Sequence, residues 1–400
     1  MSATEKELEE FRQDVSAWMS DNKPADPGFL LPQTFMEVGD EAQLEFLREW
    51  QNKVWSAGYL GMAWPKEYGG GGVDPVFQSV VDREMRKHAV PICFNVIGLG
   101  WAGPLINDIG TEEEKEKYLK GILSGEDVWC QGFSEPDHGS DLGNAQTRAV
   151  RDGDEYVLNG QKIWTTMGNF AKYMILLART NPEAKRKYDG LSYFLSPMDA
   201  PGIETVPIRK ITGEYGFTET FFTDARIPAD CLMGEEGQGW KIAMQTLQYE
   251  RGAEAGAAGG LAMIRITVDD MINELADVTR DGEPVLQDDV VRDELVKAIM
   301  EEKAMYLGDR RSRISHLTTD YPGSLPLSQK LRASDTTQDM RKIAIGAQGA
   351  EGALYVGDPD ARQGGFWQRA YFNSYSATIG GGTSQVQHNI VAEHVLGLPK

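Results

Sequence analysis

The spacing of apolar residues changes twice along this chain of 400 residues. Between Glu5 and about Lys120, apolar residues recur three and four positions apart, as in EFLREWQNKVWSAGYLGM, and this spacing predicts amphipathic helices. From about Val128 to Met233 the spacing shifts towards two and turn residues multiply, which predicts short strands. Helical spacing returns from Gly239 and continues to the C-terminus. The chain is therefore expected to be an α+β protein with more than one domain.

We place the domain boundaries where the spacing changes. The prediction is an N-terminal helical domain at 1–127, a middle β domain at 128–238 and a C-terminal helical bundle at 239–400. In the first domain, the segment that starts at Thr111 carries acidic residues where a helix would begin, and four glycines at 69–72 predict a loop.

Turn residues divide the middle region into short strands. Asp152-Gly153 and Asn159-Gly160 predict hairpin turns between TRAVR, YVLN and KIWTT. The runs YMILLART, LSYFL and TETFF predict further strands. We expect these strands to form a compact antiparallel module.

Composition excludes several functional classes. With 61 acidic and 40 basic residues the net charge is -21, which opposes binding to nucleic acid or to an anionic membrane surface, although local basic groups can still bind small anions. Three scattered cysteines, Cys93, Cys130 and Cys231, predict neither a disulfide framework nor a zinc cluster, and we expect no metal site. The N-terminus is acidic and amphipathic, and no stretch approaches the ~20 apolar residues of a membrane span. We therefore expect a cytoplasmic protein.

The stretch from Gln131 to Thr166 carries the candidate chemistry. It begins as the polar, glycine-broken run QGFSEPDHGSD and closes on Trp-Thr-Thr. Its Asp, His and Ser side chains are near-neighbours in one turn, whereas a hydrolase triad converges from separate parts of a fold, and no Gly-x-Ser-x-Gly is present. The chain also has neither a Gly-x-Gly-x-x-Gly after a strand nor a Walker A lysine.

This stretch resembles the flavin-binding signature of the acyl-CoA dehydrogenase family, which combines a Ser/Thr-Glu-Pro…Gly-Ser-Asp loop with a Gly-x-Lys-x-Trp-x-Thr strand. The helix, β, helix order resembles the fold of the same family over nearly the whole chain. The resemblance implies an N-terminal α-helical domain, a middle antiparallel β-barrel domain and a C-terminal four-helix bundle that builds the oligomer. It also implies that FAD is the cofactor.

The resemblance implies roles for individual residues. In the family, the loop before Glu-Pro binds the pyrimidine edge of the flavin. The Trp of Gly-x-Lys-x-Trp-x-Thr flanks the ring, and the Thr that ends this motif points towards N5. The Gly-Thr-x-Gln segment lies near the adenosine half of FAD. The matching residues here are Gln131, Phe133, Ser134, Gly139, Ser140, Trp164, Thr166, Thr383 and Gln385.

The reaction of this family requires a base for the proton next to the thioester. Many members use the Glu of a Tyr-Glu-Gly-Thr motif, but here Gly381 stands in its place. A minority uses a Glu-Arg pair on the first C-terminal helix, which Glu250 and Arg251 match. We therefore predict Glu250 as the base and Glu254, one turn later, as the second candidate. The alternative for any isolated helical Glu is a solvated or Arg-paired carboxylate.

The resemblance also implies a substrate site and partners. The predicted substrate-binding residues are Ser140, Tyr249, Arg251, Gly381 and Gly382, and the Gly381 amide would bond the thioester oxygen. The combination of CQGFSEP, Glu-Arg and Gly-Gly-Thr-Ser resembles a bacterial subgroup that acts on bulky, branched or ring-containing acyl-CoAs. We expect an electron-transferring flavoprotein as the electron acceptor. An oxygen-using acyl-CoA oxidase is the alternative.

The expected assembly is a homotetramer, built as a dimer of dimers. Two departures from the family pattern keep a heterotetramer, or a non-catalytic half-site subunit, as alternatives. Arg280 is displaced in VTRDGEP relative to Arg-x-x-Phe-Gly, and Ile343 replaces the Gln of Gln-x-x-Gly-Gly-x-Gly.

Overall fold

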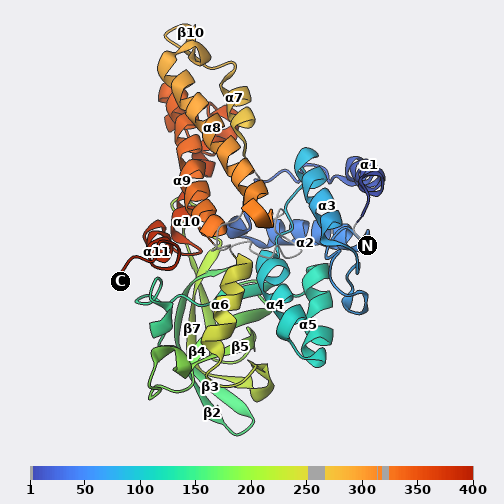
Figure 1. The fold of residues 1–400 in the computed structure, drawn as a ribbon, viewed down its shortest axis with the longest axis vertical. Helices are drawn as coiled ribbons and strands as arrows, with labels where there is room; N and C mark the ends of the chain where they lie inside the picture. Colours follow the sequence, from blue (N-terminus) through green and yellow to red (C-terminus); the bar gives the residue numbers. More distant parts are fainter. Residues whose placement is uncertain (1–2, 251–265, 313, 318–323, 400) are drawn as a thin grey trace. The chain divides into compact units, whose positions relative to one another are not determined.

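The computed structural model describes residues 3–250, 266–312, 314–317 and 324–399. The chain divides into two compact units, Met1–Ile264 and Arg265–Lys400, and each is described by itself (Figure 1). Arg251 and Glu254, predicted as a substrate-binding residue and as the second candidate base, lie outside the described residues.

The first unit begins with helices, as the apolar spacing predicted. They are α1 (Glu5–Asn22), α2 (Glu41–Ser56), α3 (Pro75–Lys87), α4 (Gly103–Ile109) and α5 (Glu112–Ser124). The predicted start of α5 is confirmed, because the Thr111 side chain accepts a hydrogen bond from the Glu114 amide and forms a capping box. The glycines at 69–72 lie in a loop, also as predicted.

A π-helical segment precedes α4 without a break. It is η3 (Ile97–Ala102), and it contacts both β1 and the later helix α6. A Cβ on Gly103 would meet the Trp64 ring at 2.1 Å, so only glycine fits at this junction. Such π-segments occur often at functional sites.

The middle of the first unit is one sheet of eight strands. Its strands are β1 (Trp129–Gly132), β2 (Arg148–Asp152), β3 (Glu155–Thr166), β4 (Tyr173–Arg179), β5 (Leu191–Pro197), β6 (Ile203–Ile208), β7 (Phe217–Pro228) and β8 (Leu232–Met233). The strand order is β6-β7-β3-β2-β4-β5-β8, and β1 pairs with β4. The predicted all-antiparallel arrangement needs a correction, because β1 runs parallel to β4 and the sheet is mixed.

One predicted hairpin turn is wrong and the other is shifted by one residue. Residue 152 pairs with Glu155, so the two-residue turn is Gly153-Asp154. Asn159 and Gly160 lie inside the continuous strand β3, where the register with β7 shifts. The Asn159 side chain donates to the Asp224 carboxylate and accepts from the Asp224 backbone amide, both at 3.0 Å, and a Cβ on Gly160 would meet Thr147 at 2.7 Å. The Asn-Gly pair therefore forms a bulge rather than a turn.

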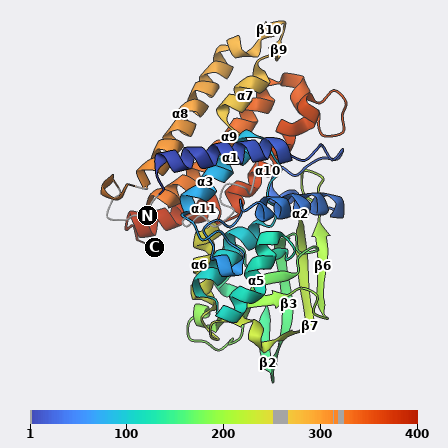
Figure 2. The same ribbon diagram turned by 90° about the vertical axis from the view of Figure 1, so that its right-hand side faces the viewer.

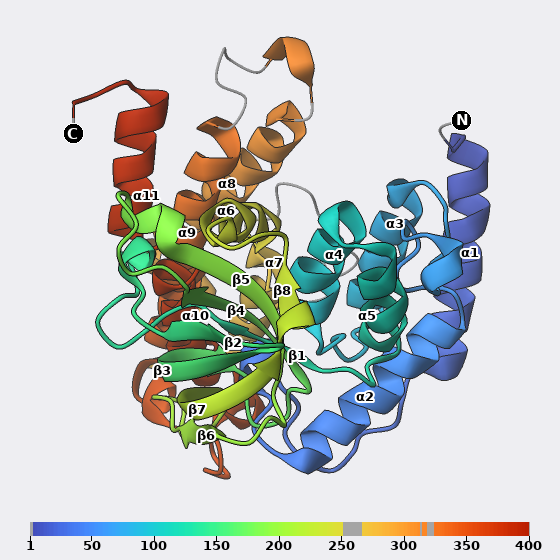
Figure 3. The ribbon, with the colours of Figure 1, turned by 90° about the horizontal axis from the view of Figure 1, so that it is seen from below.

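Helix α6 (Gly239–Glu250) packs on the sheet within the first unit. It contacts β5 and β4, and Figure 3 shows it nearly end-on beside β5. The contact at its start is close, because a Cβ on Gly239 would lie 2.5 Å from the Ser192 backbone. The helix that carries the predicted base is thus fixed to the sheet that carries the flavin-loop residues.

The second unit is helical, as predicted. Its helices are α7 (Val268–Leu275), α8 (Asp289–Ser312), α9 (Ser324–Ala347), α10 (Phe366–Ile379) and α11 (Ser384–Ile390), and a hairpin of β9 (Thr279–Arg280) and β10 (Glu283–Pro284) joins α7 to α8. Helix α9 contacts α7, α8, α10 and α11, and Figure 2 shows α8 and α9 running alongside each other. Buried Met271, Leu295 and Trp367 belong to its apolar core. The α+β fold class is confirmed.

Within the described ranges, no helix combines the length and the apolar content that a membrane span requires.

Candidate functional site

The predicted flavin loop leaves the sheet at the end of β1. Gln131 lies in β1, and Phe133 and Ser134 follow at its end. The Ser134 carbonyl accepts a hydrogen bond from the Ile163 amide at 2.9 Å. The structure thus brings the two halves of the signature together, because Trp164 follows Ile163 in β3.

A buried ion pair holds this loop. The Lys162 ammonium, which is 0% exposed, lies 2.8 Å from the Glu135 carboxylate and donates to the Phe133 carbonyl at 3.0 Å. Glu135 also accepts hydrogen bonds from the Gln146 and Thr147 amides at 2.6 and 2.8 Å. Both ends of the loop are therefore attached to one carboxylate.

Electrostatics favour the ionised form of Glu135. Burial acts to raise the pKa of Glu135, but the charge of Lys162 and the hydrogen bonds outweigh it and hold the pKa below its usual value. Arg179 stabilises the far side of the loop by donating to the carbonyls of Ala145 and Gly143 at 2.9 and 3.0 Å.

Trp164 lies two residues after Lys162 in β3, but its side chain is exposed whereas that of Lys162 is buried. It lies where the β3–β7 register shifts between Lys162 and Thr165, and its backbone has φ +62°, which is strained for a residue other than glycine. Its side chain is 55% exposed and meets Phe217 edge-on at 5.9 Å between ring centroids. Thr166 is buried and pairs with Phe217 in β7. Strained backbone at a bulge is typical of functional sites, and here it holds an exposed indole.

The residues of this loop fit the flavin that the signature implies. The Gln131 side-chain oxygen is buried and has no hydrogen-bond partner among the described residues. A buried polar atom of this kind requires a partner. Together with the exposed indole of Trp164, Gln131 offers a polar contact and an aromatic surface, as an isoalloxazine ring requires.

Gly139 and Ser140 lie in an exposed turn after this loop. The next residue, Asp141, is tied down by Lys187 at 2.6 Å and by Asn144 at 2.5 Å. Lys187 belongs to η5 (Lys187–Gly190), so this ion pair joins the turn that carries Ser140 to the connection between β4 and β5.

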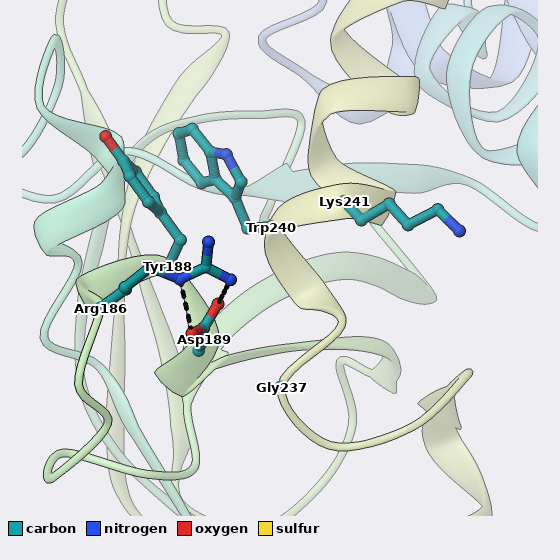
Figure 4. A pocket seen from close by; sticks show the side chains of 6 residues that line it. All are labelled: Arg186, Tyr188, Asp189, Gly237, Trp240 and Lys241. Atoms are coloured by element: carbon teal, nitrogen blue, oxygen red, sulfur yellow. Dashed lines mark hydrogen bonds and ion pairs between the residues drawn. The ribbon is translucent and has the colours of Figure 1, made fainter.

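A shallow pocket of about 360 Å³ lies between η5 and the start of α6. Tyr188 and Trp240 face each other there, with 4.5 Å between ring centroids, and Figure 4 shows Arg186 paired with Asp189 beside them while Lys241 points away. With Lys187, three basic residues lie around this pocket, and two of them, Arg186 and Lys187, are each paired with a carboxylate.

The turn of α6 that carries Glu250 is attached to two neighbours. The Tyr249 hydroxyl donates to the Asp108 carboxylate of α4 at 3.2 Å, and the Gln245 amide donates to the same carboxylate. On another side, the Thr246 hydroxyl lies 2.9 Å from the Tyr193 hydroxyl. Glu250 itself is half-buried, and Tyr249 is 8% exposed.

The remaining predicted site residues lie in the second unit. Gly381 and Gly382 have φ +65° and +95°, and their carbonyls accept hydrogen bonds from Gln387 at 2.9 Å and Lys330 at 2.6 Å. The Thr383 hydroxyl caps α11 by accepting from the Val386 amide at 3.1 Å. Gln385 is exposed.

Three residues that shape the site were given no role from the sequence, although Lys162 is the Lys of the Gly-x-Lys-x-Trp-x-Thr motif. The role of Lys162 could have been predicted from strand alternation. Lys162 is an even number of residues from Tyr156 and Leu158, which are buried in β3, so its side chain is expected to be buried as well and to need a buried partner. Asp108 and Tyr193 had no such signal, because their contacts with α6 span 141 and 53 positions.

Family models match almost the whole chain in three consecutive parts. They are the acyl-CoA dehydrogenase N-terminal domain at residues 6–126, middle domain at 130–225 and C-terminal domain at 237–396.

Similarity to individual proteins supports the same family. The chain is 35% identical to "Acyl-CoA dehydrogenase IpdE1" of Mycolicibacterium smegmatis over 98% of both chains. It is similar to the solved structure "Tcur3481-Tcur3483 steroid ACAD", with 33% identity, a TM-score of 0.80 and full coverage of both chains. The ChsE4-ChsE5 complex from Mycobacterium tuberculosis is similar at 27% identity and a TM-score of 0.78, over 100% of this chain and 99% of that one. The chain belongs to the acyl-CoA dehydrogenase family of flavoenzymes.

Proposed function

We propose that this enzyme oxidises an acyl-CoA thioester to the trans-2-enoyl-CoA with FAD as its cofactor. The observation that carries the proposal is the flavin loop. The buried Lys162–Glu135 pair fixes it and leaves Gln131 and Trp164 available to a ligand. The helix that bears Glu250 packs on the same sheet.

In this proposal Glu250 removes the proton from the carbon next to the thioester carbonyl. Bound FAD would supply the acceptor for the hydride that leaves the β carbon. Gln131, Phe133, Ser134, Gly139, Ser140, Trp164, Thr166, Thr383 and Gln385 bind the cofactor. The Gly381 amide donates to the thioester oxygen as negative charge develops there. Ser140, Tyr249, Arg251 and Gly382 complete the contacts with the substrate.

We propose bulky, branched or ring-containing acyl-CoAs as substrates. Two observations support this class: Gly381 stands where many family members carry a Glu, and the chain is similar to a protein whose title reads "steroid ACAD". The basic groups around Tyr188 and Trp240 support an anionic substrate such as a CoA thioester. Bleaching of the flavin absorbance with short, long, branched and cyclic acyl-CoAs tests the class.

An electron-transferring flavoprotein is the proposed electron acceptor. The exposed ring of Trp164 supports transfer to a docked protein, because it gives the flavin region an aromatic group at the surface. The second candidate is an oxygen-using oxidase. Rapid reoxidation of the reduced enzyme by air, measured by stopped flow, would favour the oxidase over the dehydrogenase.

A homotetramer, arranged as a dimer of dimers, is the proposed assembly. A heterotetramer is the second candidate, supported by the displaced Arg280, whose guanidinium donates to the Gly346 and Ala347 carbonyls at 3.0 and 3.2 Å. Native mass spectrometry with an FAD count per chain separates the two. Chains that bind no FAD when purified alone would indicate a half-site subunit.

The base assignment has a direct test. Glu250→Gln removes the base but keeps a similar shape, so we expect the protein to retain FAD and to lose substrate-dependent bleaching by at least about 100-fold. Glu254→Gln serves as the comparison and is expected to bleach normally. Normal bleaching by Glu250→Gln would overturn the assignment and transfer it to Glu254.

A further inference from the structure

We propose that Asp108 is a positioning residue that holds the turn of α6 carrying Glu250. The proposal rests on the proposed function, in which Glu250 is the base. Asp108 lies in α4, far from the flavin signature in sequence, and belongs to none of the segments that the family resemblance assigns to the site.

One carboxylate oxygen of Asp108 accepts two donors from α6. The Tyr249 hydroxyl lies 3.2 Å away and the Gln245 amide also donates to it. Gln245 and Tyr249 are four residues apart, so they share one face of the helix, and their polar groups lie 3.4 Å from each other. Glu250 follows Tyr249 directly, so this contact restrains both the position of α6 along its axis and its rotation about that axis next to the proposed catalytic base.

A second attachment holds the same turn from the sheet. The Tyr193 hydroxyl of β5 lies 2.9 Å from the Thr246 hydroxyl, and both residues are fully buried. The Tyr193 ring meets Phe133 of the flavin loop edge-on at 5.9 Å between centroids. Thr246 is four residues before Glu250, so Tyr193 connects the flavin loop to the base helix.

The helix that carries Asp108 is itself positioned relative to the flavin strand. It continues from η3, which contacts β1 as well as α6. Asp108 therefore sets the position of α6 with respect to the same element that supports the beginning of the flavin loop. Proton abstraction requires the base within hydrogen-bonding reach of the substrate carbon, and a small displacement is enough to slow it strongly.

The test is Asp108→Ala in the FAD-loaded enzyme. We expect the rate of flavin bleaching at saturating acyl-CoA to fall about tenfold while FAD content stays unchanged, and KM to change by a smaller factor through Tyr249, which loses its hydrogen bond to Asp108. The deuterium isotope effect on bleaching should increase for substrate labelled at the α carbon, because abstraction of that proton becomes slower. A contribution to folding alone would not change the isotope effect.

Two variants serve as controls. Asp108→Asn keeps an acceptor oxygen and should recover most of the rate, and Asp199→Asn, which changes another exposed carboxylate of the first unit, should leave the rate unchanged. If Asp108→Ala does not retain FAD, Gln245→Leu replaces it: a slower rate with intact FAD supports the proposal, and a wild-type rate overturns it.

Failure of this proposal can be distinguished from failure of the base assignment. A wild-type rate and isotope effect in FAD-loaded Asp108→Ala, combined with an inactive Glu250→Gln, overturns the positioning role alone. Normal bleaching by Glu250→Gln overturns the base assignment and with it the proposed role of Asp108.

Discussion

The loop after β1 and the loop between α10 and α11 are both expected to contact FAD and substrate, but the protein holds them by different means. The first is held by buried charged side chains, with the Glu135 carboxylate accepting from Lys162 and from two amides. The second is held through its own carbonyls, which accept from Lys330 and Gln387. The first loop contributes a side chain of its own, the Glu135 carboxylate, and so depends on the identity of that residue. The second loop contributes only its carbonyls to these contacts and so depends on its backbone conformation and on the donors Lys330 and Gln387.

The two loops therefore tolerate substitution differently. Replacing Glu135 or Lys162 would leave a buried charge without its partner, which is strongly unfavourable. At position 381 the described contact uses the carbonyl, and φ of +65° suits glycine. The loop between α10 and α11 therefore keeps its shape without the Glu that many family members carry, provided that another residue supplies the base.

The largest effect is expected from Lys162→Met, which breaks the first arrangement. It leaves Glu135 buried and unpaired, and we expect a loss of about 3–5 kcal/mol in the free energy of unfolding together with loss of FAD. Chemical denaturation and the flavin spectrum measure both. Lys297→Met is the matched control, because Lys297 pairs with Asp293 at 2.5 Å while both side chains are largely exposed, at 70% and 63%, and it should cost about 0–1 kcal/mol. Equal effects of the two variants would contradict the role given to the buried pair.

A smaller effect is expected from Gly382→Ala, which tests the backbone-held loop. Gly382 has φ +95°, and an added Cβ would lie 2.7 Å from the Gln387 amide nitrogen that binds Gly381. Strain and the weakened hydrogen bond should together cost about 1–3 kcal/mol in the free energy of unfolding.

The control for this variant is Gly346→Ala in α9, where no described atom lies within 4 Å of the added Cβ. We expect a gain of about 0.5–1 kcal/mol, because alanine favours a helix more than glycine does. A destabilised control together with a neutral Gly382→Ala would contradict the account of this loop.

The sequence predicted the helices and most strands, because apolar spacing and turn residues are local signals. The capping box at Thr111 illustrates this. The prediction of a turn at Asn159 was wrong because of a tertiary contact. The Asn159 side chain forms a hydrogen bond with Asp224 on the neighbouring strand, and β3 continues past Asn159. Family resemblance supplied most candidate site residues. Neither apolar spacing nor family resemblance identified Asp108, because apolar spacing does not determine which helices pack together and Asp108 lies outside the family motifs.

The smallest stability effect is expected from Trp164→Gly, which separates function from folding within one strand. Glycine relieves the strained φ of +62°, which costs roughly 1–2 kcal/mol, while loss of the edge-on contact with Phe217 removes about 0.5–1.5 kcal/mol. The two nearly cancel, so the free energy of unfolding without FAD should change by less than about 1 kcal/mol. FAD affinity and reoxidation by an electron-transferring flavoprotein should both decrease, as titration and stopped-flow absorbance would measure. Val150→Gly, at another exposed apolar position of the same sheet, should leave both unchanged. If Trp164→Gly unfolded the protein as severely as Lys162→Met, the indole would be part of the loop's support rather than a surface for the cofactor and its partner.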